Sequence, residues 1–308
     1  MARRWNFDDL DPQVGMYFEE ELTSVRSEVK KKKKKPKNGF KLIPQDPDDP
    51  DWSETVEHRM WDIEGTGSEF ISDYTDMPPL VGVNMEKDDW PVKEFGCAYQ
   101  YSKNEIRKAS STGKGLDRKK AMAAREFNER KFNRIQWFGA PQVGLFGLLN
   151  YPYIPRWQVS IPFDNSQTGQ DILNELNSFV RAPFDVTEDE ADTPDTLLMP
   201  TTQFAYINDT PWSSNAGDTT ILGHFRSNNF FIDDVRPVRE CNGAGPNGED
   251  VMLAYRQEED LVAHKLVMEH NQHDPQQEGL AFITPATAKS GGIVSDFPFE
   301  MVIGEFPL

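Results

Sequence analysis

The sequence contains little cysteine, since Cys97 and Cys241 are the only two in 308 residues. Two thiols cannot form the multi-disulfide framework of a small secreted domain, and they cannot supply the four thiolates of a structural zinc site. We therefore expect a protein of a reducing compartment.

Long apolar segments are also missing. The longest run, residues 143–149, contains two glycines and is far shorter than the ~20 residues that cross a bilayer. The N-terminal MARRWNFDDL has arginines but no apolar stretch behind them, so no signal peptide is expected. These absences exclude secreted, membrane-embedded and fibrous proteins.

Bulky core residues are plentiful, although only 37 % of the residues are hydrophobic and the mean hydropathy is −0.66. The chain has 20 Phe, 7 Trp and 8 Tyr. A chain of this length buries roughly three quarters of its unfolded surface and corresponds to about two domains. Global disorder is therefore not expected.

Positive charge is scarce overall but concentrated in two segments. The net charge is −18, yet residues 26–41 carry +8 and residues 103–134 carry +7, so the remainder carries −33. Such an acidic balance argues against a protein that simply coats nucleic acid. The run Lys30 to Lys35 is either a solvated segment or an arm that meets phosphate or an acidic neighbouring chain.

The first third of the chain predicts an arm followed by a hairpin. Residues 1–60 combine short apolar pieces with acids, the lysine run and a Pro/Asp-rich string, which leaves little to bury. Period-two alternation from residue 68 onward predicts a β-hairpin. Its polar tip is expected at residues 86–89, between a strand at residues 81–85 and a strand at residues 95–101.

A long helix is expected next. Ser102 and Glu105 have the capping-box spacing that begins a helix, and the helix resumes after a pause at residues 110–115. Apolar residues then recur at three- and four-residue steps over residues 118–137, with basic residues between them. This pattern predicts one packed face and one basic face. Further helices are expected at residues 169–180 and 219–228, and strands at 233–240, 251–256, 280–284 and 299–303, which makes a mixed α+β fold.

One glycine motif matches a nucleotide-binding pattern by letters alone. Residues 243–248 read G-x-G-x-x-G, but Pro246 and Asn247 favour a turn where the motif needs the start of a helix. We interpret this segment as a loop between strands.

The histidines form one metal-like cluster in the sequence: His264, His270 and His273, with Glu269. The residues around His273 are typical of a surface loop, and no nucleophile and base can be paired from the sequence. We expect no catalytic residue, no cofactor and no metal.

A series of short motifs runs in order through residues 61–305. The motifs are ISDY at 71–74, PLV at 79–81, WPV at 90–92, YQYSKNE at 99–105, FG at 138–139, GLLN at 147–150, VMLAYR at 251–256, GLAF at 279–282 and GGIV at 291–294. This series resembles the major capsid proteins of tailed bacteriophages, in the branch that also resembles encapsulin shells.

The resemblance implies the Hong Kong 97-type capsid fold, of class α+β. Its parts would be an N-terminal arm (1–60), an extension loop (61–101), a peripheral domain with a long spine helix (102–165), an axial domain (166–278) and a return to the peripheral domain (279–308). The arm matches nothing in the family pattern, and no residues match an autocatalytic lysine–asparagine cross-link.

The function implied by the resemblance is a major capsid protein that assembles into pentamers and hexamers of an icosahedral shell around double-stranded DNA. The shell would be a virion capsid assembled in the host cytoplasm, with portal, scaffold and decoration proteins as further partners and no membrane. Subunit contacts are expected in the extension loop at Met77, Leu80, Val81, Met85, Asp88 and Trp90. DNA contacts are expected on the helix at Arg118, Lys119, Arg125, Arg130 and Arg134. Two alternatives stay open: an encapsulin-type shell around a protein cargo, and a soluble metal-dependent enzyme using the histidine cluster.

Overall fold

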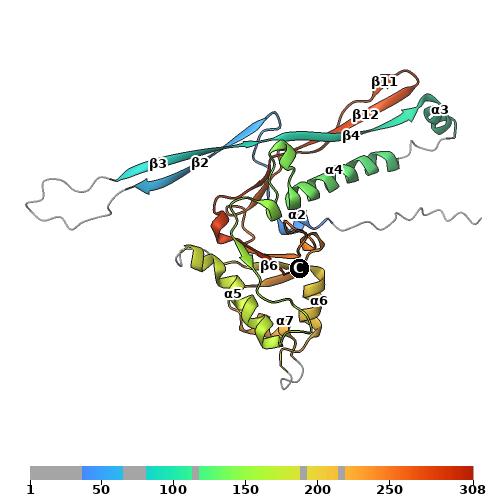
Figure 1. Ribbon diagram of the computed structural model, residues 1–308. Helices are drawn as coiled ribbons and strands as arrows, with labels where there is room; N and C mark the ends of the chain where they lie inside the picture. The colour runs from blue at the N-terminus through green and yellow to red at the C-terminus, as the bar shows by residue number, and fades with distance from the viewer. Residues whose placement is uncertain (1–36, 65–80, 113–117, 188–192, 214–218, 308) are drawn as a thin grey trace, which may run out of the picture. The chain divides into compact units, whose positions relative to one another are not determined.

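A computed structural model of the chain describes residues 37–64, 81–112, 118–187, 193–213 and 219–307. The chain divides into a segment Met1–Pro36, which includes the lysine run and lies outside the described residues, and a compact unit Lys37–Leu308. The compact unit combines helices and sheets (Figure 1), so the expected α+β class is confirmed.

A five-stranded mixed sheet separates the two main hydrophobic cores of the compact unit. Along β8, Met252 and Ala254 belong to one core, whereas Leu253 and Tyr255 belong to the other, because successive side chains of a strand point to opposite faces. Burial on both faces explains the uninterrupted apolar run of this strand. In spatial order the strands are β5 (Arg156–Gln158), β14 (Val302–Glu305), β8 (Val251–Tyr255), β6 (Thr196–Met199) and β7 (Asp234–Pro237).

Three helices supply the first core: α5 (Gly169–Thr187), α6 (Thr201–Asp209) and α7 (Ile221–Asn228). The predicted helices at residues 169–180 and 219–228 correspond to α5 and α7. Thr220 caps α7, since its Oγ1 accepts a hydrogen bond from the Gly223 amide at 3.1 Å.

The second core anchors the beginning of the compact unit. Leu42, in α2 (Gly39–Leu42), and Ile43 are 3 % and 1 % exposed. We expected residues up to 60 to form an arm with little to bury, and for residues 37–46 this is wrong, because this apolar pair is buried against Trp137 and Tyr255. The segment continues as β1 (Gln45–Asp46), which pairs with β9 (Ala263–Lys265), and β9 pairs with β13 (Gly292–Val294).

The predicted capping box is confirmed at the start of α3 (Lys103–Thr112). The Ser102 amide donates to Glu105 Oε2 at 3.0 Å, and the Glu105 amide donates to Ser102 Oγ at 3.1 Å. The long helix α4 (Arg118–Phe138) follows, and it packs on β4 and β12 (Figure 1). Ala124, Phe132 and Ile135 are buried in this contact and beside it, as their spacing predicted.

The sheet against which α4 packs joins distant parts of the chain. β4 (Lys93–Ser102) pairs along its whole length with β12 (Ala281–Ser290), in antiparallel register with Tyr101 opposite Phe282. On its other edge β12 pairs with β10 (Met268–Gln272) and β11 (Gln276–Glu278). The predicted partner of residues 95–101 was the strand at residues 81–85, and this is wrong.

The hairpin exists, but with different strands. β2 (Thr55–Glu64) pairs with β3 (Gly82–Pro91) over ten residues each, and among the described strands these two form a sheet of their own. Residues 86–89, expected at the tip, lie inside β3. Residues 65–80, between the two strands, lie outside the described part of the chain.

Short 3-10 helices fill the connections: η2 (Pro141–Val143), η3 (Leu148–Asn150), η4 (Arg239–Cys241) and η5 (Pro298–Glu300). Across the described ranges, the helices are too short or too polar to cross a bilayer.

Candidate functional site

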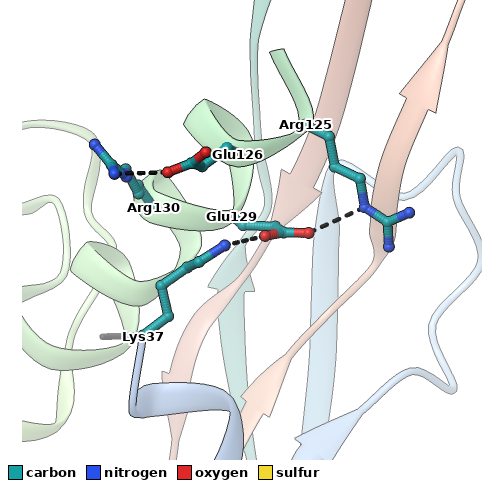
Figure 2. A network of polar contacts seen from close by, with 5 residues as sticks. All are labelled: Lys37, Arg125, Glu126, Glu129 and Arg130. Carbon is teal, nitrogen blue, oxygen red and sulfur yellow. Dashed lines mark hydrogen bonds and ion pairs between the residues drawn. The ribbon is translucent and has the colours of Figure 1, made fainter. Parts of the chain in front are cut away.

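The basic residues of α4 are partly neutralised by acids on the same helix. Arg125 Nε donates to Glu129 Oε1 at 3.0 Å, and Arg130 Nη2 donates to Glu126 Oε1 at 2.7 Å. Figure 2 shows that Lys37, at the beginning of the compact unit, forms an ion pair with the other carboxylate oxygen of Glu129, Oε2. Burial raises the pKa of Glu129, but the hydrogen bonds from Lys37 and Arg125 outweigh burial and hold that pKa below its usual value.

The predicted single basic face is wrong. Arg125 and Arg134 are nine residues apart, which is about two and a half turns of helix, so they lie on opposite sides of α4. Arg125 borders a cavity of about 240 Å³ together with Glu129 and His270. Lys119 and Arg134 are exposed, and the side chain of Arg118 lies outside the described residues.

The histidines that look like a metal cluster in the sequence do not converge with Glu269 on one site. His264 is fully buried; its Nδ1 contacts Gln45 and Gln136, and its Nε2 contacts Ser290 Oγ at 2.9 Å. Burial lowers the pKa of His264 to about 3, so it is neutral at physiological pH. 

Of the other two histidines, His270 lies on β10 and His273 directly follows that strand. His270 Nδ1 meets Asn128 Nδ2 at 3.0 Å, and His273 Nε2 meets Thr287 Oγ1 at 2.7 Å. Within the described ranges no three His, Cys, Asp or Glu side chains are grouped to hold a metal ion. Residues 243–248 form a loop between η4 and β8, as interpreted from the sequence.

Three apolar side chains, two on β3 and one directly before it, form an exposed stripe. Val81, Val83 and Met85 are 63 %, 64 % and 62 % exposed, and their alternation places them on one face. Asp88 is exposed as well. Met77 and Leu80, the other expected contact residues nearby, lie outside the described residues.

Trp90 belongs to a different environment. Its ring stacks on Tyr151 and meets Phe146 edge-on, with both ring centroids 6.1 Å away. Burial raises the pKa of Tyr151 to about 12, and its hydroxyl donates to the Ser295 carbonyl. The ring that we expected at a subunit contact is therefore already covered on these sides by its own chain.

An apolar groove beside α3 was not predicted from the sequence. It has a volume of about 490 Å³, and its lining includes Tyr99, Tyr101, Ile106, Ala121, Pro275 and Phe282. These residues come from β4, α3, α4, β12 and the connection between β10 and β11. Only the pairing of β4 with β12 brings them together, so no local signal in the sequence marks the groove.

Comparison with protein families assigns the chain to one of them. A sequence profile described as "Major capsid protein" matches residues 67–303. The chain belongs to the major capsid protein family. It is a structural component of a virion shell, as the ordered motifs implied.

The solved structures that resemble this capsid protein share its fold. The capsid of Myoviridae phage XM1 superposes with a TM-score of 0.78 at 16 % identity, covering 94 % of this chain and 98 % of that one. A Mycobacterium phage Bobi structure gives a TM-score of 0.60 at 14 % identity, covering 93 % and 95 %. The virus-like particle from Pyrococcus furiosus gives 0.56 at 13 % identity, covering 86 % and 91 %. A comparison with curated proteins found no match.

Proposed function

We propose that copies of this capsid protein form pentamers and hexamers that close an icosahedral shell around double-stranded DNA. Assembly takes place in the host cytoplasm, with portal, scaffold and decoration proteins as further partners. A closed shell needs each copy to offer two different surfaces to its neighbours, since such heterologous contacts generate rings.

The observation that carries this proposal is the exposed stripe of β3. A two-stranded hairpin alone is at best marginally stable in water, and three large apolar side chains that are each more than 60 % exposed add no stability to their own subunit. A neighbouring subunit that covers Val81, Val83 and Met85 removes apolar area from water at roughly 25 cal/mol per Å².

We assign the domain roles accordingly. The extension loop is the hairpin from β2 to β3, which begins at Thr55 rather than at residue 61. The peripheral domain contains α3, α4 and the sheet of β4 and β12, and the axial domain contains α5, α6 and α7.

For contact with DNA, we propose Arg134 ahead of the other expected residues. Its side chain is exposed, whereas Arg125 and Arg130 already bind carboxylates of their own helix. An encapsulin-type shell would hold a protein cargo instead, so the contents of the particle distinguish the two functions.

The test is to express the full chain and examine it by sedimentation and negative-stain microscopy. Closed particles of megadalton mass are expected, and particles from infected cells should contain nuclease-protected double-stranded DNA. A stable monomer or dimer in infected cells would refute the shell, and a protein cargo without DNA would favour the encapsulin-type alternative.

A further inference from the structure

We propose that one side of α4 binds single-stranded RNA. This side, called the α4 ridge below, consists of Phe127, Lys131, Arg134 and Phe138, which recur at steps of four, three and four residues. At about 3.6 residues per turn, such steps align side chains along one line of a helix. The inference rests on the proposed nucleic-acid contact of Arg134 and adds a second kind of strand to it.

The α4 ridge lies beside the contact between α4 and the sheet, not within it. Phe127 and Phe138 are 58 % and 37 % exposed, and Arg134 is exposed as well. Asn128, the residue after Phe127, is only 2 % exposed and contacts His270 of β10. Consecutive residues are about 100° apart around a helix, so the buried side and the ridge are neighbouring sides of α4.

The charge of the α4 ridge is positive only. Glu126 and Glu129, the two acidic residues of α4, lie outside the ridge, and each already binds an arginine. In the part of the chain that the structure describes, Lys131 and Arg134 form no ion pair. Two cations without a carboxylate partner favour a polyanion such as a phosphate backbone.

The exposed phenyl rings favour a single strand over a duplex. In a duplex the bases are stacked on one another, so a protein reaches only phosphates, sugars and base edges. A single strand offers free base faces, and proteins that bind single strands combine positive charge with aromatic side chains on which bases stack. Phe127 and Phe138 are eleven residues apart, about 17 Å along the helix axis, with both cations between them. The ridge therefore offers stacking surfaces at its ends and phosphate contacts in its middle.

The place of assembly selects RNA. In the host cytoplasm, where we propose that assembly takes place, single-stranded RNA is abundant, whereas the proposed contents of the shell are double-stranded. A newly made subunit therefore meets RNA before it meets packaged DNA.

Fluorescence anisotropy with a labelled oligouridine and dissociated full-length subunits measures the affinity. Phe127→Ala is expected to weaken binding about tenfold, because one stacked base is lost, and Phe127→Tyr should keep most of the affinity. Phe230→Ala is the matched control, since Phe230 lies between α7 and β7, is 96 % exposed and should not matter. Every variant keeps the lysine run, so differences between variants report on α4.

A duplex of the same length separates stacking from phosphate contact. Phe127→Ala should leave the affinity for the duplex unchanged. Arg134→Gln should weaken both complexes and reduce the log–log salt slope for the single strand by about 0.7. Unchanged affinity of Phe127→Ala for RNA, or equal losses for RNA and duplex, would overturn the stacking role. Tighter binding of oligo(dT) than of oligouridine would overturn the choice of RNA.

Cross-linking with 4-thiouridine locates the strand on the chain. Irradiation followed by trypsin is expected to label the peptide of residues 126–130, which contains Phe127. Label confined to residues 26–41 would place the RNA on the lysine run and contradict the proposal.

The outcomes separate this inference from the shell. Phe127 is mostly exposed, so Phe127→Ala subunits should unfold at the same temperature as the unmodified chain and still form particles. Loss of particles with unchanged affinity for RNA would assign the α4 ridge to a protein contact instead. Failure of the unmodified chain to form particles refutes the proposed shell, whereas the affinity of dissociated subunits for RNA is measured independently of it.

Discussion

Trp90 stacks on Tyr151, with ring centroids 6.1 Å apart and ring planes inclined by 25°. This contact fixes the last residues of β3 in the core that also contains the end of α4. Earlier in the same strand, Val83 and Met85 are exposed. One strand therefore carries both a residue that stabilises its own subunit and residues available to a neighbour.

Replacing Trp90 with alanine is expected to destabilise the isolated subunit by about 2–3 kcal/mol. Truncating a fully buried aromatic side chain to alanine costs about 3–5 kcal/mol of stability, and Trp90 is only half-buried. Urea unfolding measures the change. Trp90→Phe should cost clearly less, because it keeps a ring on Tyr151, and Val83→Ala should leave subunit stability unchanged. Equal losses for Trp90→Ala and Val83→Ala would contradict this division.

Shortening the hairpin is expected to prevent shell closure without unfolding the subunit. Arg59 and Lys87 are register partners, so residues 60–86 can be replaced by an Asn-Gly turn that keeps the strand ends paired. Thermal unfolding should stay cooperative, and sedimentation should show no closed particles. Asn84→Ala, an exposed change on β3, is the matched control and should assemble. Normal particles from the shortened chain would refute the role of the hairpin.

His264 is expected to make stability depend on pH below about 6.5. Burial lowers its pKa in the folded state to about 3, so between these pH values the unfolded chain takes up a proton that the folded chain excludes. Its contribution is therefore complete above pH 6.5 and is lost as pH falls toward 3, by up to about 1.4 kcal/mol per pH unit.

The measurement compares urea unfolding at pH 7, 6 and 5. His264→Asn should remove part of the slope between pH 7 and 5. An unchanged slope in His264→Asn would show that other groups account for the acid sensitivity.

Charge removal on α4 is expected to weaken DNA contact unequally. Arg134→Gln should lower the affinity of dissociated subunits for duplex DNA, and each lost phosphate contact should reduce the log–log salt slope by about 0.9. Arg125→Gln should matter less, because Glu129 already binds this guanidinium group. Fluorescence anisotropy at several salt concentrations measures both. A larger loss from Arg125→Gln would overturn this ranking.

Local features of the fold were predictable from the sequence. The capping box at Ser102, the apolar spacing of α4 and the apolar run of β8 each depend on residues a few positions apart, and each is found as predicted. The ordered motifs likewise implied the family, because they identify a kind of chain without requiring knowledge of which strands pair.

The strand partners were not predictable in the same way. Residues 95–101 alternate as a strand should, but alternation says nothing about the strand that lies beside them. β12 pairs with β4 across a sequence separation of nearly two hundred residues. A sequence-based prediction pairs β4 with the adjacent strand β3 instead, because no short-range signal points to β12.

The candidate surfaces divide along the same line. The sequence by itself determined that α4 is basic and that Val81, Val83 and Met85 alternate along one strand, because these properties follow from residue type and local period. Only the tertiary structure decided that Lys37 binds Glu129, that Trp90 faces inward, and that Tyr101 and Phe282 line one groove. These outcomes depend on which distant side chains meet, and the energy of each contact arises only once the chain has brought them together.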